Sequence, residues 1–273
     1  MTLEDVQSRT DTRGVALDEV GINGLRYPVL VSDHGGDKQE SIGEFALAVA
    51  LPAEVKGTHM SRFVEILHEC ASEISAVGMQ VVHGEVLRKL KAPWAKVSVD
   101  TEFFRERLAP VSGARAKLGH RVRWTVTGGE HDSAARVEVT VPVTSVCPCS
   151  KAISDYGAHN QRGHITIGVL LAEQPDRADQ VSLVELFDLA ESAASAPVYP
   201  LLKRPDERFV TMQAYDNPVF VEDMARTVAG RLRSDARVGA FRVHTANDES
   251  IHDHAAYAVT EWPRRGAYAL EMI

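Results

Sequence analysis

The sequence predicts an α+β fold in which paired helices cover one face of antiparallel β-sheets. Pairs of segments with alternating apolar residues, typical of half-buried strands, stand at both ends of each half of the chain, and helical spacing lies between them. This strand-strand-helix-helix-strand-strand order occurs twice, in units of about 120 residues. Runs of strands with helices between them favour antiparallel sheets with helices on one face. We therefore expect two tandem units, residues 21–135 and 136–273, after a flexible, charged arm of residues 1–20.

The first half alternates well enough for four strands. They are expected at residues 27–32, 42–51, 95–103 and 118–127, with a Gly/Asp turn at residues 34–38 between the first two. A helix is expected from His59, where apolar residues begin to recur at three- and four-residue spacing, and Thr58 or Ser61 is placed to cap it. We expect Gly78 to end that helix and residues 81–91 to form a second one.

The second half repeats this order. Its strands are expected at residues 136–146, 163–172, 240–247 and 255–262. One helix is expected at residues 183–194, where Leu183, Leu186 and Phe187 share a face. The other is expected at residues 218–233, because Pro218 suits the first turn of a helix.

The composition is that of an ordinary globular protein. The chain has 273 residues, 44% hydrophobic and 25% charged, so it can bury a large core. A net charge of −8 argues against a nucleic-acid partner, since nucleic-acid-binding proteins are normally basic. Three cysteines, an odd number, indicate a reducing compartment, and no apolar run suits a signal peptide or a membrane span. We expect a cytoplasmic protein with neither nucleic acid nor membrane as partner.

One segment between two expected strands carries the strongest chemical signal. Cys147 and Cys149 flank Pro148, and His159 follows in the same loop or short turn of helix. Thiolate and imidazole are preferred ligands of zinc and related divalent metals. The pair is too close for an ordinary disulfide, and an inert dithiol is the alternative. Since a closed structural zinc site needs a second cysteine pair, which is absent, the pattern favours an open, catalytic metal site.

Two further segments combine cations with hydroxyls or carboxylates. Residues 57–62 place His59 and Arg62 at a helix N-terminus, which suits phosphate binding or simple capping. Residues 201–207 gather two cations and two carboxylates beside a proline. A charged surface loop has the same composition, so the segment alone does not decide between the two.

Two segments near the C-terminus present acids and histidines. Glu222 lies in the first turn of a helix, where the helix dipole favours acids in any case. In residues 249–254, His252 and His254 alternate onto one side of an expected strand. Two imidazoles on the same side favour a functional pair.

Together these segments resemble the prokaryotic type IB GTP cyclohydrolases. The resembling motifs are Gly57-Thr-His-Met-Ser-Arg62, Val143-Thr-Ser-Val-Cys-Pro-Cys-Ser-Lys151, Gly157-Ala-His-Asn-Gln-Arg-Gly163, Leu202-Lys-Arg-Pro-Asp-Glu207, Asn217-Pro-Val-Phe-Val-Glu-Asp223 and Ser250-Ile-His-Asp-His254. They occur in the order of that family and span most of the chain. Six motifs in order are far more specific than any one of them.

The resemblance implies a fold, an assembly and a reaction. The fold is the tunnelling fold (T-fold), in which each subunit carries two tandem β-β-α-α-β-β units, and the assembly is a homotetramer with active sites at subunit interfaces. The enzyme is a GTP cyclohydrolase I of type IB, a hydrolase acting on a cyclic amidine. It converts GTP and water to 7,8-dihydroneopterin triphosphate and formate, the first step of tetrahydrofolate biosynthesis.

The resemblance also implies a metal centre. By similarity, Cys147, His159 and Glu207 hold a divalent metal, which is manganese, iron or zinc. A cation of this kind lowers the pKa of water, so that the water attacks C8 of the purine.

Further roles follow by similarity. Cys149 is a thiol that either supports the metal ligands or acts in catalysis, and His252 and His254 shuttle protons because imidazole titrates near neutrality. Glu222 anchors the guanine edge by accepting its N–H donors. The candidates for triphosphate binding are His59, Arg62, Lys151, Arg162, Lys203 and Arg204.

Two other functions stay open at this stage. A related enzyme acting on another purine or pterin, such as an NADPH-dependent reductase of a modified guanine, would use Cys149 as its nucleophile. A metal-storing or metal-responsive protein would use the Cys147, Cys149 and His159 loop and leave GTP intact. In that protein the remaining polar motifs would have no task.

Overall fold

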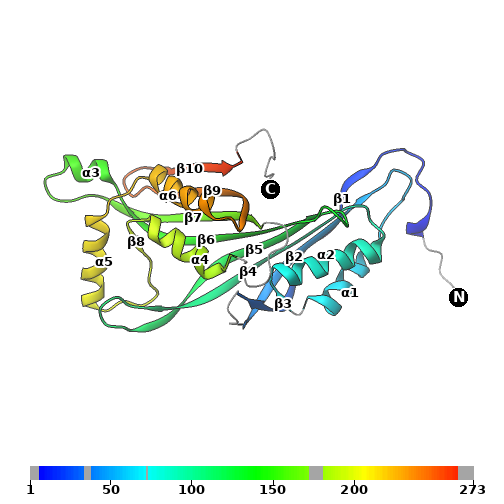
Figure 1. Cartoon of the computed structure of the whole chain (residues 1–273), viewed down its shortest axis with the longest axis horizontal. Coiled ribbons are helices and arrows are strands. Elements are labelled where there is room, and N and C mark those ends of the chain that lie inside the picture. Colours follow the sequence, from blue (N-terminus) through cyan, green and yellow to red (C-terminus); the bar gives the residue numbers. More distant parts are fainter. Residues whose placement is uncertain (1–5, 34–37, 72, 172–180, 264–273) are drawn as a thin grey trace. The chain divides into compact units, whose positions relative to one another are not determined.

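The computed structural model describes residues 6–33, 38–71, 73–171 and 181–263 (Figure 1). Its helices are η1 (Val6–Ser8), α1 (Met60–Cys70), α2 (Ala76–Leu90), α3 (Pro148–Ile153), α4 (Leu183–Ala193), α5 (Arg204–Asp216) and α6 (Val221–Ser234). Its strands are β1 (Leu17–Ser32), β2 (Lys38–Leu51), β3 (Glu73–Ile74), β4 (Ala95–Leu108), β5 (Arg115–Gly128), β6 (Ala134–Val146), β7 (Asn160–Leu171), β8 (Ala196–Pro197), β9 (Val238–Asp248) and β10 (Ala255–Trp262). No helix in these ranges is long and apolar enough to cross a membrane. Residues 34–37 of the expected turn and Ala172 of an expected strand lie outside the described residues.

The described strands form one mixed, ten-stranded sheet. Its hydrogen-bonded order is β10-β9-β7-β6-β5-β4-β2-β1-β3, and β8 pairs with β6. Neighbours such as β1 and β2 or β7 and β9 are antiparallel, whereas β3 runs parallel to β1. Burial alternates along β2, β6 and β9, because successive side chains point to opposite faces and only one face meets the core.

The predicted fold class, an α+β tunnelling fold of two tandem β-β-α-α-β-β units with antiparallel sheets, is wrong. The described strands belong to a single sheet, and that sheet is mixed. The described part of the second half contains the four helices α3 to α6 in place of the expected two. The duplication was inferred from local periodicity, which does not report how distant strands pair.

The structure divides into two compact units that do not follow the order of the chain. The first comprises residues 1–102 and 123–137, and the second comprises residues 103–122 and 138–273. The long strands β4 and β6, and β5 between them, therefore contribute residues to both units. The domain boundaries expected after residues 20 and 135 stay a prediction.

In the first unit, α1 and α2 pack on each other. On the predicted apolar face of α1, Phe63, Ile66 and Leu67 are fully buried and Cys70 is half-buried. α2 begins earlier than expected, because the Ser75 hydroxyl caps it by accepting a hydrogen bond from the Gly78 N–H at 3.1 Å. Gly78 therefore lies in the first turn of a helix rather than ending one. A Cβ at this position would lie 2.2 Å from the carbonyl oxygen of Glu73, so the close approach of the backbone requires glycine. Neither Thr58 nor Ser61 is the N-cap of α1, which is His59.

In the second unit, α4 and α6 pack on each other, and α6 also packs on β9 and β10. Leu183, Leu186 and Phe187 of α4 are buried, which confirms the predicted face. The expected helix at residues 218–233 starts at Val221. Residues 17–20 of the expected arm belong to β1.

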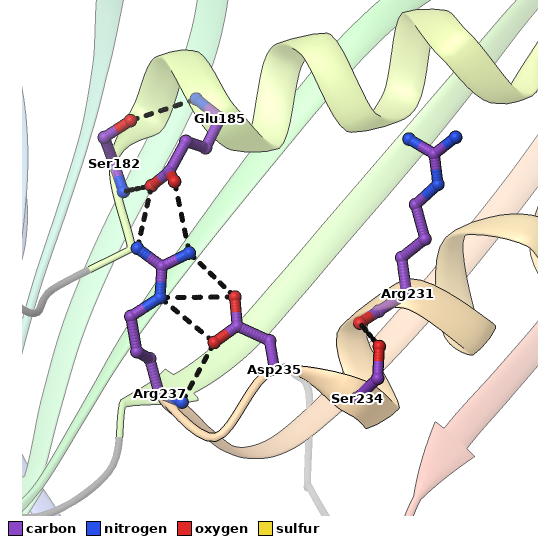
Figure 2. Close-up of polar contacts among 6 residues, drawn as sticks. All are labelled: Ser182, Glu185, Arg231, Ser234, Asp235 and Arg237. Atoms are coloured by element: carbon purple, nitrogen blue, oxygen red, sulfur yellow. Dashed lines mark hydrogen bonds and ion pairs between the residues drawn. The ribbon is translucent and has the colours of Figure 1, made fainter.

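A polar cluster fixes the start of α4 (Figure 2). Ser182 and Glu185 form a capping box, in which each side chain accepts a hydrogen bond from the backbone N–H of the other. Arg237 donates to Glu185 at 3.1 Å and to Asp235 at 2.8 Å. The guanidinium thus joins the start of α4 to the turn that leads from α6 into β9. Against the effect of burial, hydrogen bonds from the Ser182 N–H and from Arg237 hold the pKa of Glu185 below its ordinary value, and hydrogen bonds from Arg237 do the same for the pKa of Asp235.

Candidate active site

The cysteine-histidine segment connects β6 to β7, and part of it is helical. Cys147 is the N-cap of the six-residue helix α3, and Pro148 occupies the first position, where a missing N–H costs no hydrogen bond. Cys147 Sγ accepts a hydrogen bond from the Ser150 N–H at 3.4 Å. The Cys147 thiol is half-buried at the helix start, whereas Cys149 is exposed.

Two hydrogen bonds hold His159 in this loop, one to Cys147 and one to Ser150. The Cys147 N–H donates to the His159 carbonyl oxygen at 3.1 Å, and the His159 N–H donates to Ser150 Oγ at 3.2 Å. The segment therefore closes into a loop whose two ends carry the thiol and the imidazole. The His159 side chain is 14% exposed, and its Nδ1 lies 2.9 Å from Gln161 Oε1 and 3.9 Å from Glu249 Oε2.

The donor chemistry of this loop fits a divalent metal. Acceptor oxygens face Nδ1 of His159, which leaves Nε2 as the nitrogen for a metal, and the other end of the loop carries the sulfur of Cys147, a second donor type that suits such a metal. Glu207 lies exposed in the first turn of α5. Within the described ranges, no three His, Cys, Asp or Glu side chains form a group that can hold a metal ion. The structure thus brings together Cys147 and His159 but does not gather Glu207 with them.

The far end of α5 packs beside the cysteine loop. Ala214 of α5 forms an apolar cluster with Val146, the last residue of β6, and with Ala196 of β8. Lys151 of α3 donates to the Tyr215 carbonyl oxygen, and its Nζ lies 4.2 Å from the centre of the Tyr215 ring. The predicted phosphate ligand Lys151 is therefore held by α5.

The start of α5 is fixed by one buried carboxylate. Asp206 is fully buried and accepts four hydrogen bonds, from the Lys203 N–H at 2.8 Å, the Val111 and Ser112 N–H groups at 2.8 Å each, and the Ser112 hydroxyl at 2.6 Å. Figure 1 shows the turn between β4 and β5, which carries Val111 and Ser112, beside this end of α5. Burial opposes ionisation, but the hydrogen bonds from Ser112 and the backbone hold the pKa of Asp206 well below its usual range.

His252 and His254 lie in the turn between β9 and β10, so their predicted place on a strand is wrong. Their side-by-side position is confirmed, because the two rings stack with centroids 5.0 Å apart and planes 16° apart. Both side chains are exposed.

Glu222 lies exposed in the first turn of α6 and lines a cavity of about 480 Å³ between α6 and β10. The cavity also presents Arg226 and Arg233 from α6 and the stacked rings of Phe241 and Trp262, whose centroids are 6.2 Å apart. A carboxylate beside aromatic and cationic groups suits a planar, anionic ligand with N–H donors.

The remaining predicted substrate ligands are divided between the two units. Arg162 lies exposed on β7 of the second unit, and Lys203 and Arg204 lie exposed at the start of α5. His59 and Arg62 lie at the N-terminus of α1 in the first unit. Their role in binding phosphate stays a prediction.

Known proteins resemble this chain over nearly its whole length. The family model described as type I GTP cyclohydrolase folE2 matches residues 3–258. The chain belongs to this family. GTP cyclohydrolase FolE2 of Methylococcus capsulatus is 44% identical over 269 residues, 98% of each chain. The FolE2 of Burkholderia thailandensis is 46% identical over 265 residues, 96% of each chain.

Solved uricases share the fold of this GTP cyclohydrolase family member at low identity. The uricase from Bacillus fastidious matches with a TM-score of 0.56 and 9% identity over 92% of this chain and 94% of the uricase. The uricase from Arthrobacter globiformis gives a TM-score of 0.53 and 8% identity over 92% and 95%. This likeness concerns the fold alone. With the single mixed sheet, it replaces the two-unit arrangement expected from the sequence.

Three residues around the predicted site of this family member were not recognised in the sequence. Gln161 contacts His159. Its position two residues after His159 was the signal in the sequence, because side chains two residues apart in an extended segment lie on the same face. Glu249 lies near the same ring and carried no signal beyond its motif. Asp206 is the third residue of a helix with proline in its first turn, a combination that predicts a helix start rather than a charged loop.

A buried histidine in the second unit should make stability depend on pH. His120 is fully buried and stacks on Phe187 with ring centroids 4.1 Å apart, and neither ring nitrogen has a hydrogen-bond partner among the described residues. Burial, with repulsion from Arg105 and Arg107, lowers the pKa of His120 from 6.5 to about 4. Between these values the unfolded chain binds more protons, so acidification through this range should cost about 3 kcal/mol of stability.

The variant His120→Phe keeps the stacked ring and removes the titration. Urea unfolding measured from about pH 7 down to about pH 4.5 should give a shallower loss of stability for the variant than for the wild type. Glu191 has the opposite effect, because burial raises its pKa, but it is present in both proteins and cancels in the difference. Equal slopes for the two proteins would contradict the assignment to His120.

Proposed function

We propose that the protein is a GTP cyclohydrolase I of type IB, which converts GTP and water to 7,8-dihydroneopterin triphosphate and formate in the first step of tetrahydrofolate biosynthesis. The observation that carries this proposal is the family match across residues 3–258. It is supported by the loop that brings Cys147 and His159 together. Unlike a metal-storing or metal-responsive protein, a GTP cyclohydrolase has a use for all six polar motifs.

Opening the purine needs water to add at C8, the imidazole ring to open and C8 to leave as formate. A divalent metal, manganese, iron or zinc, supplies a Lewis acid that lowers the pKa of water near neutrality. Cys147 and His159 would hold it, with Glu207 as the proposed third ligand. This mixed set of sulfur, nitrogen and oxygen donors suits all three metals.

The other residues of the site bind GTP and move protons. Cys149 lies exposed in the first turn of α3, next to the proposed metal ligand Cys147, and is the proposed catalytic thiol. His252 and His254 would transfer protons to and from the opening ring. Glu222 would accept the N–H donors of the guanine edge, and the aromatic wall of its cavity suits a planar base.

Binding of the triphosphate is assigned to the cationic residues. The proposed set comprises His59, Arg62, Lys151, Arg162, Lys203 and Arg204. Lys203 and Arg204 present their charges at the N-terminus of α5, where backbone N–H groups also favour anions. The proposed homotetramer with interfacial sites is tested by the mass of the particle in solution, which should equal four chains of 29.9 kDa.

The function is tested with purified protein, GTP and one of manganese, iron or zinc. Formate should be released, and the oxidised pterin product should appear by fluorescence, both in proportion to enzyme and both abolished by a chelator. A parallel sample with NADPH should show no oxidation of the nicotinamide. Failure of all three metals to give formate would overturn the proposal, and consumption of NADPH would indicate the reductase instead.

A further inference from the structure

We propose that Gln161 is a positioning residue that fixes His159 in the tautomer with its proton on Nδ1, and that Ser145 and Asn247 hold Gln161 in the orientation this requires. This role extends the function proposed above, since His159 is one of its metal ligands. The residues concerned form a buried polar group at the junction of β6, β7 and β9.

The orientation of the Gln161 amide follows from the hydroxyl of Ser145. Ser145 is fully buried, and its Oγ donates to the Val219 carbonyl oxygen at 3.3 Å. A hydroxyl has one proton, so every other hydrogen bond to this oxygen must come from a donor. Gln161 Nε2 lies 3.5 Å from it and Asn247 Nδ2 lies 3.0 Å from it, both as N–H donors.

The tautomer of His159 then follows from the orientation of the Gln161 amide. With its NH₂ group turned to Ser145, Gln161 presents Oε1 to His159 Nδ1 at 2.9 Å. An amide oxygen only accepts, so Nδ1 must carry the proton and donate it. The Glu249 carboxylate, 3.9 Å from the same nitrogen, favours the proton there as well. Nε2 is left with its lone pair, the form in which imidazole binds a metal.

The same hydroxyl joins the segments that carry the proposed site. Ser145 stands two residues before Cys147, and Asn247 stands two residues before Glu249. Val219, which accepts the Ser145 proton, leads into α6 with Glu222, and its own N–H donates to the Val146 carbonyl oxygen at 3.2 Å. A residue that hydrogen-bonds to a metal-binding histidine sets the orientation and the basicity of the imidazole ring. Loss of such a residue typically lowers metal affinity by about 10- to 100-fold.

The first test reads the tautomer directly, without metal or GTP. Protein labelled with ¹⁵N-histidine is examined by NMR at about pH 8.5, where a histidine of ordinary pKa is neutral, and His159 is identified by the signal missing from His159→Ala. The wild type should show the Nδ1–H pattern. Gln161→Met, nearly the same size but without an acceptor, should lose it, especially when combined with Glu249→Gln. Gln161→Glu restores an acceptor oxygen and should restore the pattern.

The second test measures affinity for zinc alone, by competition with a chromophoric chelator. Gln161→Met should bind zinc about 10- to 100-fold more weakly, and Gln161→Glu should stay within about threefold of the wild type. Thr140→Val is the matched control, because it removes a hydroxyl contact of 3.1 Å to Thr166 between the same two strands. It should leave both readouts unchanged.

An Nδ1–H pattern that persists in the double variant, or equal losses in Gln161→Glu and Gln161→Met, would overturn the role of Gln161. Neither measurement contains GTP. A protein that passes both but releases no formate therefore disproves the proposed function and leaves the tautomer assignment intact. A wild type that shows the opposite tautomer disproves the assignment whether or not the protein turns over GTP.

Discussion

Replacing Cys147 with alanine should lower kcat/KM for formate release from GTP by about a thousandfold, because it removes the thiolate from the proposed metal site. Loss of several kcal/mol of transition-state stabilisation by the metal corresponds to a factor of this size. The measurement is the rate of formate release at saturating manganese, with the metal content of each preparation determined in parallel. Bound metal and activity should fall together.

Cys70→Ala is the matched control for Cys147→Ala. Cys70 is a half-buried free thiol at the end of α1 in the first unit and belongs to none of the polar motifs. Its replacement should leave metal content and rate unchanged. A Cys147→Ala enzyme that retains both full metal content and more than about a tenth of the wild-type rate would contradict the ligand role.

The candidate site was predictable from the sequence where it is built from residues that lie close together in the chain. Cys147 and His159 lie in one loop, so their spacing already indicated a shared task, and a backbone hydrogen bond from the Cys147 N–H to the His159 carbonyl oxygen shows that the two residues are adjacent. The contact between Asp206 and the turn at Val111 joins residues 95 positions apart. No local pattern reports such a contact, and Asp206 therefore looked like one more charge in a polar loop.

Two missed elements have specific physical reasons. α5 buries only Asp206 and Ala214, so it lacks the apolar stripe by which helices are recognised. The first part of β1 contains two register shifts against β2, one between Leu17 and Val20 and one between Ile22 and Leu25. A bulge reverses the faces of the residues that follow it, and the alternation that reveals a strand is lost.

The pairing of the strands could not be predicted from the sequence for a different reason. Both halves contain strand pairs around helices, and this local order is compatible with two sheets or with one. Pairing through β4, β5 and β6 joins all strands described into a single sheet, and each of these three strands contributes to both compact units. Which strands pair is decided by packing over the whole molecule, and local propensity carries little information about it.

Asp206→Ala should lower the melting temperature by about 10 °C, one of the largest stability effects expected in this protein. The substitution removes the one buried acceptor shared by four part-buried donors, and donors left without a partner beside a buried position are costly. Asp206→Asn keeps one acceptor oxygen but turns an NH₂ group towards donors, so an intermediate decrease is expected. Ser112→Ala removes one of the four hydrogen bonds and should have the smallest effect. Thermal unfolding followed by circular dichroism gives the order.

Asp216→Ala is the control, because this exposed carboxylate ends the same helix. Its melting temperature should stay within about 1 °C of the wild type. Since Asp206 also fixes the turn of α5 that presents Lys203, Arg204 and Glu207, formate release by folded Asp206→Asn should fall at temperatures well below its melting point. A variant that unfolds earlier but releases formate at the wild-type rate when folded would show that Asp206 stabilises α5 without positioning the charges at its start.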